Sequence, residues 1–291
     1  MIRVERWRAG GDLRAVAERA TLVSVWVATT ALAAYSVFAY TVISSPGLDT
    51  HAYWLAGHVS DPYLIGPGER DAVLYSPLFV QAMRVLALLP WPVFYGLWVV
   101  AESCAYVWLL HPLPVRWRVP ALLTCVPAII IGNIYGMLGV TLVLGVSRAP
   151  WFAAAALTKV TPAGVGAIWY AARGDGRRLA ALVLTVGALA GASFVAEPDL
   201  WASWARFLTS HSGDGAGRLV QIPLGLLLAV VAARTDRRWL LAVAWWFTMP
   251  MASVLKVQSL VALAPLVRLL VSRPVVSSRA SSKARDELPA R

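Results

Sequence analysis

The chain has 291 residues, of which 59% are hydrophobic and only 14% are charged. Soluble domains carry about 25% charged residues, so this composition excludes a soluble globular domain and a disordered chain. The net charge of +11 would suit a nucleic-acid binder, but the basic residues lie in short runs between apolar stretches, as in cytoplasmic loops. We therefore expect a multi-spanning membrane protein that binds no nucleic acid.

The N-terminal part begins with a basic segment, residues 1–20, followed by an apolar stretch, residues 21–43, that is long enough to cross a bilayer. A spanning helix needs about 20 apolar residues because the hydrocarbon core is about 30 Å thick. Residues 44–74 are polar, carry four acidic side chains and contain proline and glycine turn signals, so we interpret them as an outer loop. The apolar segment 77–89 is too short to cross comfortably, and residues 93–110 form the next span.

The apolar stretches of the C-terminal part are short or interrupted. Residues 120–146 are split at Gly132-Asn133, and a lysine- and proline-containing segment interrupts residues 150–172. The Ser- and Arg-rich tail, residues 272–291, is expected to be disordered. The remaining apolar stretches are 179–196, 219–233, 239–249 and 257–270.

Basic clusters orient the chain, because Lys and Arg concentrate in cytoplasmic loops. Placing every cluster inside puts both termini in the cytoplasm and the polar segments 44–74 and 197–217 outside. Residues 120–146 are then either a hairpin that turns outside at Asn133, which we favour, or one broken span. The count is roughly eight to ten membrane segments. We expect an all-α, polytopic membrane helix bundle with one transmembrane domain over residues 21–271.

Irregular backbone at membrane depth is tolerated only where it lines protein or a cavity, so the broken helices predict an outward-opening cavity. Glu102 lies in the middle of a span, where an ionised carboxylate is costly, and we favour its pairing with an arginine. Lys159 interrupts an apolar segment, and such charges are usually functional, although snorkelling to the interface is the alternative. His51 and His58 lack diagnostic ligand spacing, as do the two cysteines, so we expect no metal site.

Asp49 follows the first span in the segment Leu48-Asp49-Thr50-His51-Ala52-Tyr53-Trp54. Its chemistry leaves two interpretations. The carboxylate is either a general base whose pKa is tuned by partial burial or a solvated group in a polar loop.

The segment around Asp49 resembles the first outer loop of glycosyltransferase family 87. These are GT-C-type membrane enzymes that include polyprenyl-phosphate-mannose-dependent α-1,2-mannosyltransferases. The resemblance extends over residues 20–270, but Ser76 stands where the family often has proline, and the chain is shorter than many members. The motifs that carry it are Asp49 with Ala52-Tyr53-Trp54, Tyr75-Ser76-Pro77, Gly132-Asn133-Ile134-Tyr135 and Lys159-Val160-Thr161-Pro162.

The resemblance implies a GT-C-like enzyme of the plasma membrane. It would transfer a hexose such as mannose, with inversion, from a polyprenyl phosphate to an envelope glycolipid or glycan on the outer face. Asp49 would be the general base, and no cofactor is expected because the lipid-linked sugar is itself a substrate. The candidate cations for the donor phosphate are Lys159, Lys256, Arg70 and Arg84. The other side chains expected to line the cavity are His51, Tyr53, Tyr75, Asn133 and Gln258.

The second hypothesis is a non-catalytic membrane protein, either a carrier of lipid-linked sugars or a degenerate relative that serves as a partner subunit. A transporter is expected to place paired charges along a path open to both sides and, in many folds, to show repeated halves. The sequence has no convincing internal repeat, and its acidic residues favour the outer segments. Both features favour the enzyme.

Overall fold

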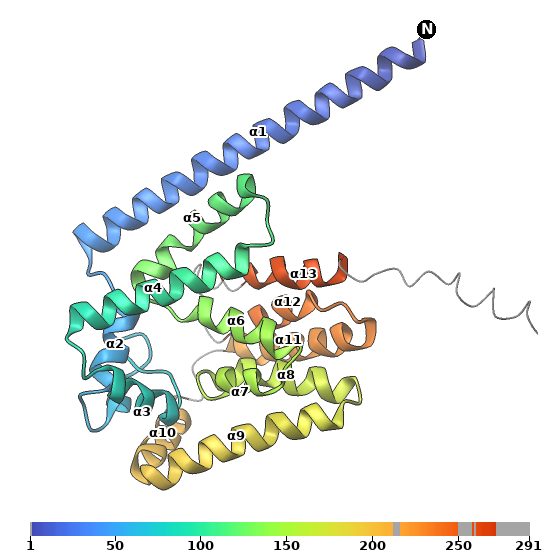
Figure 1. Ribbon diagram of the computed structural model, residues 1–291. Helices are drawn as coiled ribbons and strands as arrows, with labels where there is room; N and C mark the ends of the chain where they lie inside the picture. Colours follow the sequence, from blue (N-terminus) through green and yellow to red (C-terminus); the bar gives the residue numbers. More distant parts are fainter. Residues whose placement is uncertain (1, 212–215, 250–257, 259, 272–291) are drawn as a thin grey trace, which may run out of the picture.

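The computed structural model shows a helical bundle and describes residues 2–211, 216–249, 258 and 260–271 (Figure 1). These residues contain no β-strand, which confirms the all-α class. A π-helical turn, Ala39–Ile43, extends the first helix, and a 3-10 turn, Pro62–Leu64, follows the second. The α-helices are α1 (Ile2–Phe38), α2 (Leu48–Ala56), α3 (Pro77–Leu86), α4 (Trp91–Leu110), α5 (Val115–Ile131), α6 (Tyr135–Gly145), α7 (Pro150–Ala156), α8 (Val160–Ala172), α9 (Gly176–Ala196), α10 (Pro198–Ser210), α11 (Ala216–Thr235), α12 (Leu240–Thr248) and α13 (Leu263–Val271).

Three described helical segments are long and apolar enough to cross a membrane: Ala15–Ile43, α4 and α9. Helices α5 and α6 pass the same test together but are bent by 118° at the Gly132-Asn133 break. So sharp a bend means that the two helices do not form one straight span, which is compatible with both the hairpin and the broken span considered from the sequence. The sequence predicted eight to ten membrane segments, and most of the corresponding helices are individually too short to cross a hydrocarbon core of about 30 Å.

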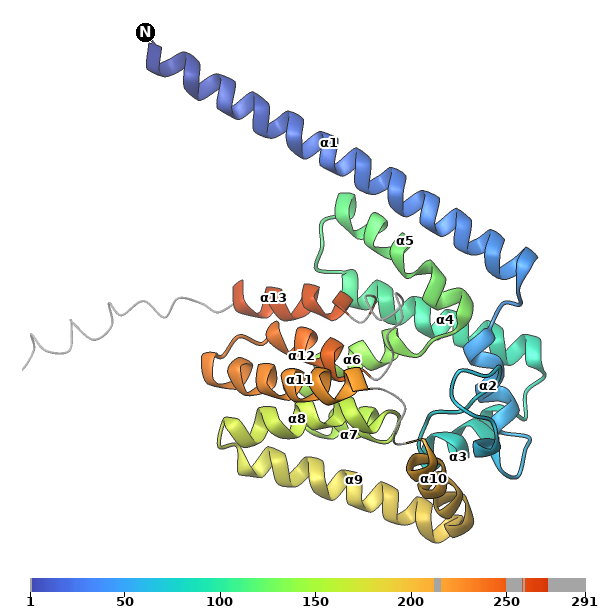
Figure 2. The ribbon, with the colours of Figure 1, turned by 180° about the vertical axis from the view of Figure 1, so that it is seen from behind.

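Helices α1 and α9 lie on opposite edges of the bundle, and α1 packs along α5 (Figures 1 and 2). Helices α2, α3 and α10 gather at one end of the bundle in both views. Two of these helices fall in the segments predicted to be polar outer loops, 44–74 and 197–217. Those segments are therefore partly helical, and they place α2 and α10 at the same end of the molecule. The predicted disordered tail, 272–291, lies outside the described residues.

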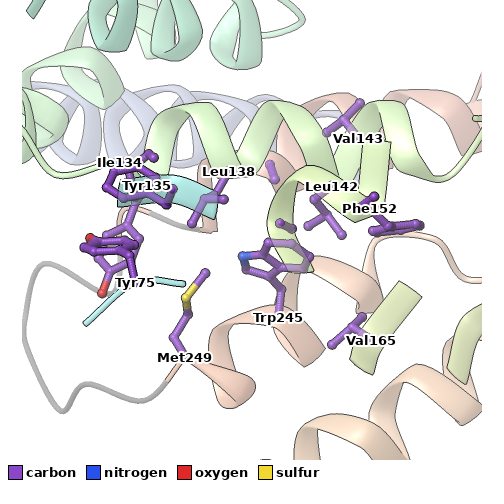
Figure 3. Close-up of a cluster of buried hydrophobic side chains, with 14 of the residues drawn as sticks. Tyr75, Ile134, Tyr135, Leu138, Leu142, Val143, Phe152, Val165, Trp245 and Met249 are labelled. Carbon is purple, nitrogen blue, oxygen red and sulfur yellow. The ribbon is translucent and has the colours of Figure 1, made fainter. Parts of the chain in front are cut away.

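Helix α6 runs through the centre of the hydrophobic core. Its side chains Leu138 and Leu142 pack among Phe152 of α7 and Trp245 of α12 (Figure 3). Two tyrosines, Tyr75 and Tyr135, lie side by side at one end of this cluster. The core therefore continues directly into the part of the molecule where α2 and α3 meet the break between α5 and α6.

Candidate active site

Asp49 stands in the first turn of α2, at a point fixed by the preceding glycine. Gly47 has a φ of +74°, a left-handed conformation that glycine adopts without strain, and its N–H donates to the carbonyl of Ile130 at 2.8 Å. This bond joins the start of α2 to the last turn of α5. The carboxylate of Asp49 therefore lies at a helix N-terminus, where negative charge is favoured.

The break between α5 and α6 packs against α2. Gly132 ends α5 with a φ of +77°, and a Cβ atom there would overlap the hydroxyl of Thr50 and lie 2.7 Å from its Cβ. The indole N–H of Trp98 donates to the Gly132 carbonyl at 2.8 Å. Only glycine combines this conformation with such a close approach, so the break is held at a fixed distance from Asp49.

Asn133 uses this fixed break to hold the carboxylate. Its Oδ1 accepts the backbone N–H of Tyr135 at 3.2 Å, which assigns the opposite side of the amide to Nδ2. Nδ2 donates to Oδ2 of Asp49 at 2.6 Å. Asn133 is itself 4% exposed, so this charge-assisted hydrogen bond is shielded from solvent.

Glu102 of α4 supports the same break between α5 and α6. The carboxylate is fully buried and accepts the backbone N–H groups of Gly136 at 3.0 Å and Met137 at 3.3 Å. The expected pairing with an arginine is wrong for the described residues, because the first turn of α6 supplies the partners instead. Glu102 and Asn133 together satisfy three N–H groups at the start of α6, which fixes the helix beside Asp49.

Lys159 lies in the short break between α7 and α8, outside the candidate spans. Its side chain is 6% exposed, and Nζ lies 5.1 Å from the ring centre of Tyr75 and 4.5 Å from that of Tyr135. Ser76 anchors this break by donating its hydroxyl to the carbonyl of Leu157 and its N–H to that of Thr158. The lysine is therefore held between two aromatic faces, a position that suits a cation.

Asp49 and Lys159 each change the ionisation of the other. Burial raises the pKa of Asp49 above its ordinary value of 3.8, and the positive charge of Lys159 and the hydrogen bond from Asn133 partly oppose this rise. Burial lowers the pKa of Lys159 to about 8, against the attraction of Asp49. A raised carboxyl pKa and a lowered lysine pKa at one place are typical of functional sites.

Two buried tyrosines complete the floor of the site. The hydroxyls of Tyr53 and Tyr75 lie 2.6 Å apart, and Tyr63 donates to the carbonyl of Tyr75 at 2.9 Å. Burial raises the pKa of both Tyr53 and Tyr75 well above 10, so both hydroxyls stay neutral. The hydroxyl of Tyr135, a residue only 1% exposed, has no hydrogen-bond partner in the described part of the chain.

These groups surround a cavity of about 450 Å³, within the usual range for small-molecule sites. The segment 68–72 covers one side of it, and Asp71 in this segment has a φ of +66°. Asp71 Oδ1 lies 2.7 Å from Nδ1 of His51, which ties the segment to α2. The lining residues are Ser44, Leu48, Asp49, Ala52, Tyr53, Gly68, Glu69, Arg70, Asp71, Ala72, Leu74, Tyr75, Asn133 and Lys159.

Six of the residues predicted for the site line this cavity: Asp49, Tyr53, Arg70, Tyr75, Asn133 and Lys159. His51 lies behind it, on Asp71. Sequence reasoning missed Glu69 and Asp71, which line the cavity, and Tyr135, which does not line it but whose ring centre lies 4.5 Å from Nζ of Lys159. The acidic outer segment held a signal for the first two, and the Gly-Asn-Ile-Tyr motif contained the third.

The structure places two predicted residues away from the cavity. Arg84 forms an ion pair with Glu197 of the second outer segment, and the two side chains line a separate depression. Gln258 donates from Nε2 to the carbonyl of Thr124 at 3.0 Å and is not among the lining residues. Lys256 lies outside the described residues. In the ranges that the structure covers, no group of three His, Cys, Asp or Glu side chains could hold a metal ion.

Comparison with known proteins agrees with the resemblance noted in the sequence. No curated protein and no solved structure matches the chain significantly. The family model described as glycosyltransferase family 87 matches residues 74–281, well over half of the chain, and includes Tyr75, Asn133 and Lys159 but not Asp49. The chain therefore belongs to glycosyltransferase family 87 and is a membrane glycosyltransferase.

Proposed function

We propose that the enzyme transfers a hexose, in the first instance mannose, from a polyprenyl phosphate to a hydroxyl of an envelope glycolipid or glycan on the outer face of the plasma membrane. The observation that carries this proposal is the placement of the Asp49 carboxylate and the Lys159 ammonium at one cavity. A glycosyl transfer from a phosphate needs one group to accept a proton and another to stabilise the departing negative charge. The cavity supplies one of each.

The reaction is a single displacement. The acceptor hydroxyl attacks the anomeric carbon, the bond between that carbon and the phosphate oxygen breaks, and the configuration inverts. The hydroxyl proton passes to Asp49, and the bonding electrons leave with the polyprenyl phosphate. Asn133 occupies Oδ2 of Asp49, and Oδ1 accepts no hydrogen bond from the described residues, so Oδ1 is the oxygen assigned to the proton.

Lys159 is the residue assigned to the departing phosphate. A buried ammonium stabilises developing negative charge more strongly than an exposed one, because the surroundings are less polar than water. The unpartnered hydroxyl of Tyr135 lies in the same neighbourhood, since its ring is 4.5 Å from Nζ of Lys159. We assign this hydroxyl as a hydrogen-bond donor to a phosphate oxygen. Arg70 lines the cavity with a largely exposed side chain and is assigned a weaker, screened contribution.

The test is transfer in proteoliposomes from labelled polyprenyl-phosphate mannose to a mixed pool of envelope lipids and glycans. We expect Asp49→Asn to lower the rate at least about 100-fold, the range that general bases contribute. Asp199→Asn is the matched control, because Asp199 is an exposed carboxylate on α10 that does not line the cavity. Full activity of Asp49→Asn would refute the assigned base. Donor binding by wild-type protein without transfer to any acceptor would favour the non-catalytic carrier.

A further inference from the structure

The cavity that contains Asp49 holds a second carboxylate, on the segment 68–72, to which the proposed reaction assigns no role. This carboxylate belongs to Asp71, which lines the cavity and whose side chain is 16% exposed. The other two charged residues of the segment, Glu69 and Arg70, are exposed to solvent. Water and salt screen exposed charges, so Asp71 is the residue of this segment whose charge acts most strongly inside the cavity.

His51 fixes the carboxylate of Asp71 from the helix that carries the proposed base. Nδ1 of His51 lies 2.7 Å from Oδ1 of Asp71. Because an ionised carboxylate only accepts hydrogen bonds, the imidazole is the donor. The imidazole is itself held between indoles, with ring centres 5.1 Å from Trp91 and 6.0 Å from Trp54. His51 follows Asp49 by two positions on α2, so the two carboxylates of the cavity keep a fixed spacing.

The second oxygen of Asp71 is left for a ligand. Nε of Arg70 lies 3.9 Å from Oδ2, which is too far for a hydrogen bond. In the part of the chain that the structure describes, His51 is the only side chain that forms a hydrogen bond with this carboxylate, and it uses Oδ1. A largely shielded carboxylate oxygen without a donor is costly. A molecule in the cavity that brings a hydrogen-bond donor to Oδ2 removes this cost.

The chemistry of the cavity determines which donor reaches Oδ2. Asp71 repels a phosphate, which Lys159 attracts instead. A hydroxyl carries no charge and donates a hydrogen bond, so it suits the free oxygen. In the proposed reaction the transferred hexose lies between the base Asp49 and the phosphate at Lys159, and both side chains line the same cavity as Asp71. The hydroxyls of this hexose are therefore the donors that the reaction brings to Asp71.

We propose that Asp71 accepts a hydrogen bond from one hydroxyl of the transferred hexose and thereby selects the donor sugar. This inference rests on the proposed function, because it assigns a residue to the sugar of the same lipid-linked donor. His51 is then a positioning residue, which acts on the sugar only through Asp71. The assignment predicts that the enzyme distinguishes donors by the presence and configuration of a single hydroxyl.

The experiment pairs the loss of the carboxylate with the loss of each sugar hydroxyl. We measure kcat/KM for polyprenyl-phosphate mannose and for its 2-, 3-, 4- and 6-deoxy analogues, at a fixed concentration of the envelope acceptor pool. Removing a hydroxyl also changes the reactivity of the sugar, but this change is common to wild type and variant and cancels in their ratio. The coupling between residue and hydroxyl remains.

Asp71→Asn is the informative variant. Asp71 has a φ of +66°, and asparagine adopts this conformation about as readily as aspartate. The amide oxygen still accepts the bond from His51, whereas an amide nitrogen, a donor, replaces the free carboxylate oxygen. Asp71→Gly is the second variant, because glycine adopts a positive φ without strain and removes the carboxylate entirely. Asp61→Asn is the matched control, since Asp61 accepts the N–H of Tyr63 at 3.0 Å in the same outer segment and does not line the cavity.

We expect one deoxy donor to lose about 10- to 100-fold in kcat/KM with wild-type protein, the range of a hydrogen bond to a charged group. Asp71→Asn and Asp71→Gly should lose a similar factor with the complete donor and nothing further with that deoxy donor. The ratio between donors does not depend on the fraction of folded protein, so a less stable variant gives the same answer. Asp61→Asn should keep the wild-type ratios between all donors.

Wild-type ratios between donors in both Asp71 variants, with transfer still dependent on Asp49, would overturn the proposal and leave the proposed function intact. Disappearance of an equal loss at saturating acceptor would overturn it as well and would place Asp71 on the acceptor. Absence of transfer from any of these donors by wild-type protein would refute the proposed function itself.

Discussion

Replacement of Gly132 by alanine tests the contact that places Asn133 beside Asp49. Gly132 has a φ of +77°, and its missing Cβ leaves the space that Thr50 occupies. A left-handed conformation costs a residue with a Cβ about 1–2 kcal/mol, and an overpacked contact costs about 1–3 kcal/mol more. Gly174→Ala is the matched control, because Gly174 has a φ of +69° and open space around it. We expect a loss of about 2–5 kcal/mol for Gly132→Ala and about 1–2 kcal/mol for Gly174→Ala.

The assay is thermal unfolding of detergent-purified protein, followed by the intrinsic fluorescence of its 14 tryptophans. Gly132→Ala should unfold at a clearly lower temperature than Gly174→Ala. Thr50→Ala should recover part of the difference in the double variant, because the overlapping hydroxyl is then gone. Equal midpoints for the two glycine variants, or no recovery by Thr50→Ala, would refute the close contact between α2 and the α5–α6 break.

Three further predictions concern the cavity. The transfer rate should show a bell-shaped dependence on pH, because Asp49 must be deprotonated, above its raised pKa, while Lys159 must be protonated, below its pKa of about 8. Lys159→Arg should move the alkaline limit of the rate profile to higher pH. An unmoved limit would exclude Lys159 as its source. Tyr135→Phe should leave the unfolding midpoint unchanged or higher, because the lost hydroxyl has no partner among the described residues. The variant should still lower kcat about 10- to 100-fold, because a hydrogen bond to the charged phosphate is worth about 1.5–3 kcal/mol. An unchanged kcat would refute the assignment of this hydroxyl as a donor to the phosphate. His51→Ala should lower kcat/KM for transfer about five- to tenfold, since the lost bond to Asp71 ties the segment 68–72 of the cavity to α2 and is worth about 1–1.5 kcal/mol. An unchanged kcat/KM would contradict this prediction.

The sequence alone was sufficient for the long apolar helices and for part of the site, because both depend on local pattern, whereas α2 and α10 lie in segments interpreted as loops. Apolar length placed α4 and α9, and glycine with asparagine placed the break before α6. Asp49 and Asn133, 84 positions apart, were placed on the same outer face by the orientation of the basic clusters and in one site by the family motifs, but their contact is known only from the structure. No local pattern states that two such distant segments touch.

Two sequence expectations that the structure corrects, those for Arg84 and Glu102, have a common physical cause. Arg84 was assigned to phosphate because it belongs to the short helix that follows the first outer segment, but its partner Glu197 comes from the second outer segment, 113 positions away. Glu102 was expected to pair with an arginine because it lies in the middle of an apolar span, but two N–H groups at the start of α6, those of Gly136 and Met137, are its partners. A charged residue in an apolar segment indicates that its side chain needs a polar partner, but only the fold determines which group that partner is.

The two charged groups of the site both depend on breaks between helices. A break exposes backbone groups that no helix satisfies, and at membrane depth these groups must find partners within the protein. At the α5–α6 break, Trp98 satisfies the carbonyl of Gly132, and the fixed backbone then presents Asn133 to Asp49. The elements that satisfy this break are therefore the elements that orient the proposed base.

The α7–α8 break follows the same rule at the proposed phosphate site. Ser76 satisfies the carbonyls of Leu157 and Thr158, the two residues before Lys159, with its hydroxyl and its N–H. A proline at position 76, as the family often has, could donate neither bond, because it has no hydroxyl and no backbone N–H. In this chain the serine supplies both bonds and so stabilises the break. Ser76, the position at which the chain departs from the family motif, therefore supports the α7–α8 break that positions Lys159.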